Sequence, residues 1–160
     1  MKRILVVVTI VVMAVFMSSV LLAQSDSSVG TWKLNVAKSK SSPVPVPQSR
    51  TVTIAAQGNG VKISANQTAA DGTHTTWSVT ANYDGKDNPI SGTGAPGGAD
   101  TIELKRINAN TTETTWKKAG KVVSTGRSVV SKDGKVRTTT TKGTDANGKP
   151  TSGVSVYDKQ

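Results

Sequence analysis

The chain has 160 residues, and its 20 Lys and Arg against 10 Asp and Glu give a net charge of +10. It has no cysteine and one histidine, which excludes a disulfide framework, a thiolate zinc site, a cysteine nucleophile and a lipoprotein anchor. Because most side chains that enzymes use are scarce or absent, we expect no enzyme activity, no metal and no cofactor.

The first 23 residues predict a signal peptide. Two basic residues precede an apolar run over residues 4–23, and small polar residues follow Ala23. Cleavage after Ala23 leaves residues 24–160 as a single domain with a net charge of +8, since two of the 20 basic residues are removed. We therefore predict a secreted or periplasmic protein. The apolar run is also long enough to span a bilayer, and Leu21 is atypical three residues before a cleavage point, so an uncleaved anchor is the alternative.

The composition of the exported part predicts an all-β domain. Threonine makes up 21 of the residues after Ala23, whereas leucine occurs there only as Leu34 and Leu104. Helices rely on Leu, Ala, Glu and Lys, while Thr and Val suit the half-buried surface of a pleated sheet.

Turn signals recur about every 11 to 14 residues along this part of the chain. Asp-Gly and Asn-Gly pairs supply the positive φ angles of tight hairpins, so each strand is expected to pair with its sequence neighbour. Such a meander leaves two open edges unless it closes on itself. We therefore predict an antiparallel up-and-down β-barrel of eight to ten strands over about residues 30–159. The turn signals are Gly58-Asn59-Gly60, Asp71-Gly72, Asp84-Gly85, residues 94–98, Asn108-Ala109-Asn110, Ala119-Gly120, Asp133-Gly134 and Asn147-Gly148.

Apolar and polar residues alternate in the early segments, which predicts strands with one face toward the interior. In residues 111–118 and 136–142 few residues are apolar on either face, and their threonines either line a polar interior or face water. Large inward residues early and small ones late predict a lopsided lumen, with an aromatic floor on one side and a hydroxyl-rich wall on the other. The predicted inward sets are Trp32, Leu34 and Val36; Val52, Ile54 and Ala56; Val61, Ile63 and Ala65; and Trp77, Val79, Ala81 and Tyr83.

Two segments lack a strand pattern. Residues 38–47 carry proline at alternate positions near their end, which removes backbone donors and favours an extended connector across one end of the barrel. Residues 91–98 hold four glycines and a proline and are expected to form a flexible loop.

The opening of the domain, Gly30-Thr31-Trp32, resembles the first-strand motif of the calycin barrels, which comprise lipocalins, cytosolic fatty-acid-binding proteins and avidins. The resemblance implies that Gly30 lets the chain enter the barrel floor tightly and that Trp32 plugs the closed end. In calycins a basic residue near the end of the barrel often packs over this tryptophan.

Three strand arginines are candidates for that basic residue: Arg106, Arg127 and Arg137. We expect Arg127 to take the position, because its neighbours on the same strand face are suited to a sheet interior. Those neighbours are Val123, Thr125 and Val129.

The final segment, residues 154–159, resembles the closing strand of fatty-acid-binding proteins, where Arg-x-Tyr holds a fatty-acid carboxylate. Tyr157 matches the tyrosine, but Ser155 stands at the arginine position, and the proline connector replaces the two-helix lid. Carboxylate capture through that motif is therefore not expected, and the simpler eight-stranded lipocalin-like form fits better.

Over its whole mature length the chain is similar to a group of small exported bacterial proteins described only as lipocalin-like. This resemblance implies a fold and an export route, and no established activity. The segments that carry it are residues 30–37, 77–86, 104–107 and 114–118.

Four aromatic residues are the predicted ligand contacts: Trp77, Tyr83, Trp116 and Tyr157. Trp77 and Tyr83 lie six residues apart and share one face of a regular strand, where they either stack on a flat or apolar ligand or pack in the core. Trp116 is either a rim aromatic or a core anchor. We interpret His74, beside a hairpin turn and without a second ligand nearby, as an exposed polar residue.

Three function classes follow, and we favour a carrier for a small apolar or amphipathic molecule. The alternatives are a binder of carbohydrate or envelope polymers and a structural envelope protein without a ligand. A sizeable lumen favours the carrier, an exposed row of aromatic residues favours the polymer binder, and a filled lumen favours the structural protein. The scattered positive charge predicts loose attraction to anionic envelope components and no specific binding of nucleic acid. After signal cleavage we expect no membrane span.

Overall fold

The computed structural model describes residues 26–145 and 147–160. This part of the chain forms twelve β-strands and two short 3-10 helices, joined by turns and loops. No helix in this part is long and apolar enough to cross a membrane. The predicted signal peptide falls outside the described residues. The elements are β1 (Gly30–Leu34), η2 (Val36–Lys38), β2 (Lys40–Ser42), β3 (Ser49–Gln57), β4 (Gly60–Thr68), β5 (His74–Asn82), β6 (Asn88–Pro89), β7 (Ser91–Gly92), η3 (Pro96–Gly98), β8 (Thr101–Asn108), β9 (Thr111–Lys118), β10 (Lys121–Val130), β11 (Val136–Thr144) and β12 (Pro150–Lys159).

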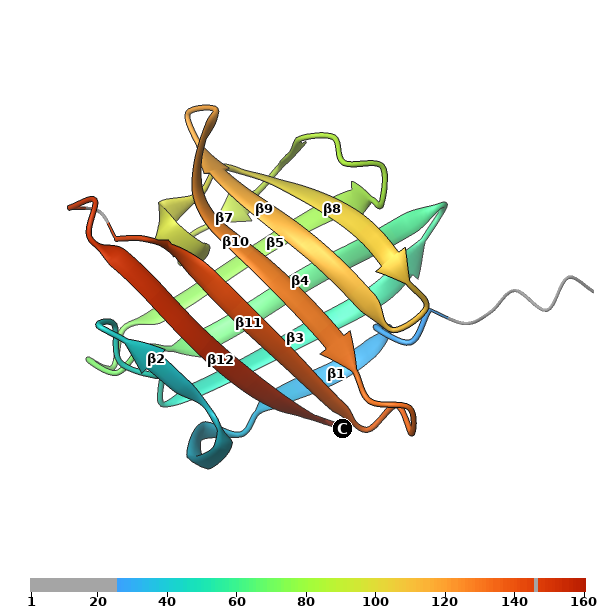
Figure 1. The fold of residues 1–160 in the computed structure, drawn as a ribbon, viewed down its shortest axis with the longest axis horizontal. Coiled ribbons are helices and arrows are strands. Elements are labelled where there is room, and N and C mark those ends of the chain that lie inside the picture. Colours follow the sequence, from blue (N-terminus) through green and yellow to red (C-terminus); the bar gives the residue numbers. More distant parts are fainter. Residues whose placement is uncertain (1–25, 146) are drawn as a thin grey trace, which may run out of the picture.

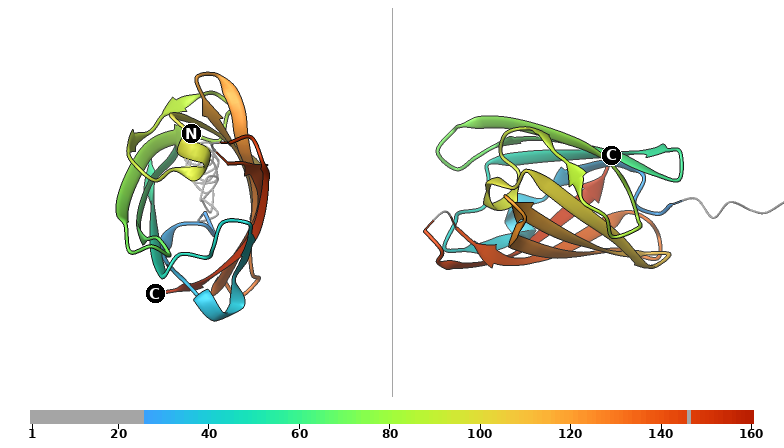
Figure 2. Two further views of the ribbon diagram at one scale, coloured as in Figure 1. Left: turned by 90° about the vertical axis from the view of Figure 1, so that its left-hand side faces the viewer. Right: turned by 90° about the horizontal axis from the view of Figure 1, so that it is seen from above.

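The strands form one antiparallel sheet that curls into a nearly closed barrel (Figure 1). Their order is β6-β8-β9-β10-β11-β12-β1-β3-β4-β5-β7, and β2 pairs with β12 outside this path. Hairpin neighbours therefore pair along most of the sheet, and β1 joins the two ends of the chain by pairing with both β3 and β12. Seen end on, the strands form a flattened ring (Figure 2, left). The predicted all-β, antiparallel architecture is confirmed.

The seam between β5 and β8 is closed by a short stretch of chain rather than by a full strand pair. β6 pairs with β8 and β7 pairs with β5, and only Ile90 separates these two short strands. A bridge between Asp84 and Lys105 and the bond from Gly85 N to Leu104 O, at 3.0 Å, tie the other end of the seam. The sheet therefore has almost no free edge, which protects it from pairing with other chains.

The prediction of eight to ten strands is too low, because the sheet has twelve; nine remain when the three shortest, β2, β6 and β7, are left out. β2 and β7 lie in the two segments expected to be a connector and a loop. These strands are two or three residues long and have no alternation of apolar and polar side chains, so the hydrophobic pattern carries no sign of them. Pro89 is accommodated because it stands in an edge strand, where a missing donor is tolerated.

Large core residues come from the early strands and also from β8, β9 and β12, whereas β10 contributes mostly small ones. Trp32 and Ile102 are fully buried, and Leu104 and Val61 nearly so. On β10, by contrast, the buried residues are mostly small, as Ser124, Gly126 and Ser128 show. Of the predicted inward sets, Val36 and Ala56 are wrong, because Val36 lies in η2 and both residues are exposed.

Candidate functional site: a cavity with two unlike walls

A cavity of about 440 Å³ occupies the barrel interior. It reaches the end of the barrel where β2, η3 and the β11–β12 hairpin lie, on the left of Figure 1. The proline connector forms part of its rim, and Val44 and Pro45 there are exposed. Pockets that hold small molecules have volumes of roughly 300–1,000 Å³, so the cavity is large enough for one such ligand.

One wall of the cavity is apolar and aromatic. Trp77 of β5 and Trp116 of β9 meet edge to face, with ring centroids 5.1 Å apart and planes at 87°. Such a T-shaped pair is a favoured arrangement of aromatic rings. The remaining apolar lining residues on this side are Val52, Ile63 and Ile102.

Gly92 allows β7 to pair closely with β5 at the position of Trp77. Gly92 is the register partner of Trp77, and its φ of +96° is one that other residues rarely adopt. A Cβ atom added there would lie 2.2 Å from the carbonyl oxygen of Thr76. The close approach of β7 to β5 therefore depends on this glycine.

The opposite wall, on β10–β12, is lined by hydroxyl groups. Ser128 of β10 and Thr139 of β11 are register partners, and their hydroxyl oxygens are 2.8 Å apart. Thr141 and Ser155 continue this wall on β11 and β12. The lumen is thus lopsided, as residue sizes along the sequence predict, but Ile102 of β8 and Trp116 of β9 add large side chains from later strands that were expected to contribute small ones.

Two arginines also line the cavity, Arg50 of β3 and Arg137 of β11. Arg137 donates from Nη2 to the hydroxyl of Ser128 at 3.1 Å, and burial lowers the pKa of its guanidinium from the ordinary value. Arg50 donates from Nε to Gln67 at 2.7 Å and from Nη1 to the hydroxyl of Tyr157 at 3.3 Å.

Tyr157 lies between these two arginines. It is 4% exposed, and the Arg137 guanidinium carbon is 5.8 Å from the centroid of its ring, while Arg50 binds its hydroxyl. The register of β12 explains the placement, since Tyr157 is paired with Leu34 on one side and with Arg137 on the other.

The closed end of the barrel is held by a separate polar cluster around Asp26. The Asp26 carboxylate accepts hydrogen bonds from Arg106, from the Tyr83 hydroxyl at 2.7 Å and from the Ser28 hydroxyl at 2.7 Å. Trp32 joins the cluster through its indole N–H, which donates to the carbonyl of Ser28 at 2.8 Å. The Arg106 guanidinium also covers the Tyr83 ring, 4.0 Å from its centroid.

These contacts shift two pKa values. Burial alone would raise the pKa of Asp26, but the bonds from Arg106, Ser28 and Tyr83 outweigh it and lower the pKa from 3.8 to about 2. The pKa of Tyr83 rises from 10.0 to about 12, mainly because the ring is buried and also because its hydroxyl donates to the Asp26 carboxylate.

The four predicted ligand contacts fall into different places. Trp77 and Trp116 lie together in the cavity wall, and Tyr157 sits beside the cavity arginines. Tyr83 belongs to the cluster at the closed end and is not among the cavity lining, so it does not form a ligand surface with Trp77.

The cation over Trp32 is Lys159, so the prediction of Arg127 is wrong. Lys159 Nζ lies 5.1 Å from the centroid of the Trp32 ring, and a Cβ at Gly30, whose φ is +139°, would come within 2.6 Å of Lys159 Cε. Arg127 points outward, where its Nη1 pairs with Glu113 at 2.7 Å. The face that carries Val129 and Arg127 is the outer one, because the inner face of β10 is built from small hydroxyl residues and glycine.

Arg50 was not among the predicted site residues, although the sequence holds a signal for it. It stands in phase with Val52 and Ile54, two residues before the first apolar position of its strand. The same phase places Gln67 with Ile63 and Ala65 on β4. A charged or polar residue in phase with an apolar face is thus the sign that the Arg50 and Gln67 side chains point inward.

His74 is exposed, and its Nδ1 lies 3.0 Å from the Thr68 hydroxyl across the β4–β5 hairpin. Within residues 26–145 and 147–160, no group of three His, Cys, Asp or Glu side chains is arranged to hold a metal ion.

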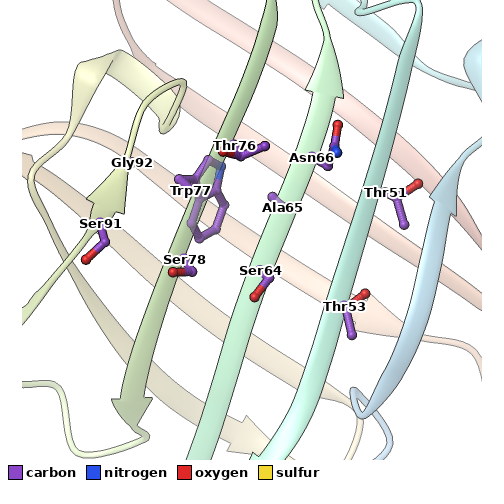
Figure 3. A pocket seen from close by; sticks show the side chains of 10 residues that line it. All are labelled: Thr51, Thr53, Ser64, Ala65, Asn66, Thr76, Trp77, Ser78, Ser91 and Gly92. Carbon is purple, nitrogen blue, oxygen red and sulfur yellow. The ribbon is translucent and has the colours of Figure 1, made fainter.

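A second hollow, of about 460 Å³, lies on the outer face of β3, β4 and β5 (Figure 3). Two cross-strand rows of polar side chains line it, Thr51-Asn66-Thr76 and Thr53-Ser64-Ser78. The Trp77 indole belongs to the other face of this sheet, where it meets Trp116. The hollow is therefore lined mainly by hydroxyl and amide groups, and Trp77 is the single aromatic residue of its lining.

Neither a protein-family model nor a curated protein matches this sequence. Two solved structures are similar in fold. The S-type phycobiliprotein lyase from Guillardia theta superposes with a TM-score of 0.53 at 10% identity, over 84% of this chain and 89% of that one. Zebrafish ileal bile acid-binding protein in complex with cholic acid gives a TM-score of 0.48 at 12% identity, over 84% of this chain and 99% of that one. At such identities the likeness concerns the fold alone.

Proposed function

We propose that the protein binds one small amphipathic molecule inside the barrel. The observation that carries the proposal is the cavity of about 440 Å³, open at one end, with an aromatic wall facing a hydroxyl-rich wall. An apolar portion of a ligand packs against Trp77 and Trp116, and its polar portion meets the hydroxyl groups of β10–β12. A purely hydrocarbon ligand suits the cavity less well, because hydroxyl groups facing it lose their water partners.

The two alternative functions have less support. A structural protein without a ligand is expected to fill its lumen with side chains, which the volume of this cavity argues against. A binder of polymers is expected to present aromatic rings outward, but the chain's three Trp and two Tyr are all buried or packed against the core.

We also propose that the protein acts by binding rather than by catalysis, and that it is exported. The first proposal rests on the scarcity of catalytic side chains and on the position of His74, which is exposed and is not among the residues that line the cavity. The second rests on the basic tip and apolar run of residues 1–23. Amino-terminal sequencing of the protein from its own host tests export, and the expected first residue is Gln24.

Native mass spectrometry of the protein from its own host tests the binding function. We expect each chain to retain one small molecule that is released on denaturation and then identified from the extract. A chain that carries no molecule when freshly purified, and that takes up no amphipathic compound in a subsequent screen, contradicts the proposal.

A further inference from the structure

The arginines of this protein fall into two groups with opposite electrostatic surroundings. Of the four arginines in residues 26–145 and 147–160, Arg106 pairs with Asp26 and Arg127 pairs with Glu113. Arg50 and Arg137 form no salt bridge among the described residues, and Asp26 acts on Arg137 only from beyond salt-bridge distance. These two are the arginines that line the cavity.

Arg137 is the more exceptional of the two. The residue is half-buried and lines the cavity. Its Nε is buried and has no hydrogen-bond partner in the described part of the chain, and Ser128 is the acceptor for Nη2. Arginine stays protonated in proteins, so a full charge is held here with most of its donors unused.

Holding this charge away from bulk water costs free energy unless an anion pairs with the guanidinium. A buried charge normally requires a partner of opposite sign, and a buried donor normally requires an acceptor. No Asp or Glu is found among the described residues that line the cavity. Arg50 adds a second positive charge nearby, joined to Arg137 through Tyr157, whose hydroxyl accepts from one arginine and whose ring lies below the other.

We propose that the ligand of this cavity is an amphipathic organic carboxylate, whose charged group is held between Arg137 and Arg50 beside the Tyr157 hydroxyl. This inference rests on the proposed function and specifies its ligand class. A guanidinium presents a planar fork of donors that matches a carboxylate. The Trp77–Trp116 pair, on β5 and β9, lines the same cavity and receives the apolar part.

The site does not depend on an arginine in the final strand. Ser155, two residues before Tyr157, is part of the hydroxyl wall, and the positive charges come from β3 and β11 instead. The register of the sheet brings them together, since β12 pairs with β11 and with β1, and β1 pairs with β3.

A competition assay tests the proposal with two ligands that differ only in the head group. The fluorescent, uncharged probe N-phenyl-1-naphthylamine is bound first, and decanoate or 1-decanol is then titrated at neutral pH. We expect decanoate to displace the probe from the wild-type protein at a concentration at least about tenfold lower than 1-decanol, since hydrogen bonds to charged groups contribute about 1.5–3 kcal/mol. In R137Q this preference falls by about tenfold or more, while the affinities for the probe and 1-decanol change by less than about threefold.

R127Q is the matched control, because it removes the same charge from the outer surface and leaves the cavity intact. It should keep the preference for decanoate. R50Q and Y157F provide independent variants if R137Q does not fold, and each should reduce the same preference. Equal affinity of the wild-type protein for both ligands, or an unchanged preference in the folded cavity variants, overturns the carboxylate proposal while probe binding still supports the carrier. Failure of the probe and both ligands to bind overturns both proposals.

Discussion

The Asp26 cluster makes a measurable prediction about stability and its dependence on pH. Replacing Asp26 with Asn removes the charge that Arg106 and Tyr83 hold at the closed end. The drop in the pKa of Asp26 from 3.8 to about 2, at about 1.36 kcal/mol per pKa unit, corresponds to about 2.4 kcal/mol. Because 32% of the Arg106 side chain is exposed, solvent screening reduces this, and we expect D26N to lose about 1–2 kcal/mol at pH 7.

The pH dependence has a definite sign. The folded-state pKa of Asp26 lies below its unfolded value, so the stabilisation is complete above pH 3.8 and is lost as the pH falls through about 2. Urea unfolding of D26N and the wild-type protein at pH 7, 4, 3 and 2.5 measures this. The difference between the two should fall to about half near pH 3.

D84N is the control for this experiment, because Asp84 is exposed and its carboxylate lies 3.9 Å from Lys86. We expect D84N to stay within about 0.5 kcal/mol of the wild-type protein. A D26N protein as stable as the wild type at pH 7, or a difference that does not change between pH 7 and pH 2.5, would refute the assigned role of the cluster.

Two further predictions concern the cavity wall and the seam beside it. In urea unfolding, the free energy of unfolding of G92A should fall by more than about 2 kcal/mol, because the new Cβ would lie 2.2 Å from the Thr76 carbonyl oxygen. The control G98A, where a Cβ meets open space, should lose about 1 kcal/mol. Equal losses in the two variants would contradict the close approach of β7 to β5. W77A should bind N-phenyl-1-naphthylamine about tenfold more weakly in a fluorescence titration, since it removes half of the aromatic pair. T76A, altered on the outer face of the same strand, should bind normally, and unchanged binding by W77A would remove Trp77 from the site.

The fold was predictable where side chains alternate in size and polarity. Trp32 and Leu34, or Val61 and Ile63, mark an interior face because they are large and apolar while their neighbours are polar. The shortest strands were not predictable in this way, since β2 and β7 are two or three residues long and consist of Lys, Ser and Gly.

The site was less predictable because the interior of this barrel is itself polar. On β10 Ser124 and Ser128 point inward and the exposed Val129 points outward, which reverses the usual rule and led to the wrong choice of Arg127. On β11 a run of threonines gives no phase, so Arg137 could not be assigned to a face. Tyr157 was identified through a family resemblance, whereas its arginine partners depend on sheet register and became apparent only in the structure.

The central claim, that the barrel interior is the ligand site, is tested most directly by filling it. Thr141 of β11 lines the cavity, while its neighbour Thr140 is exposed on the outer face. We predict that N-phenyl-1-naphthylamine binds the wild-type protein and T140W with one site per chain and equal affinity, and that T141W, still folded by circular dichroism, binds at least about tenfold more weakly. Equal binding by T141W and T140W would place the probe outside the barrel and contradict the account.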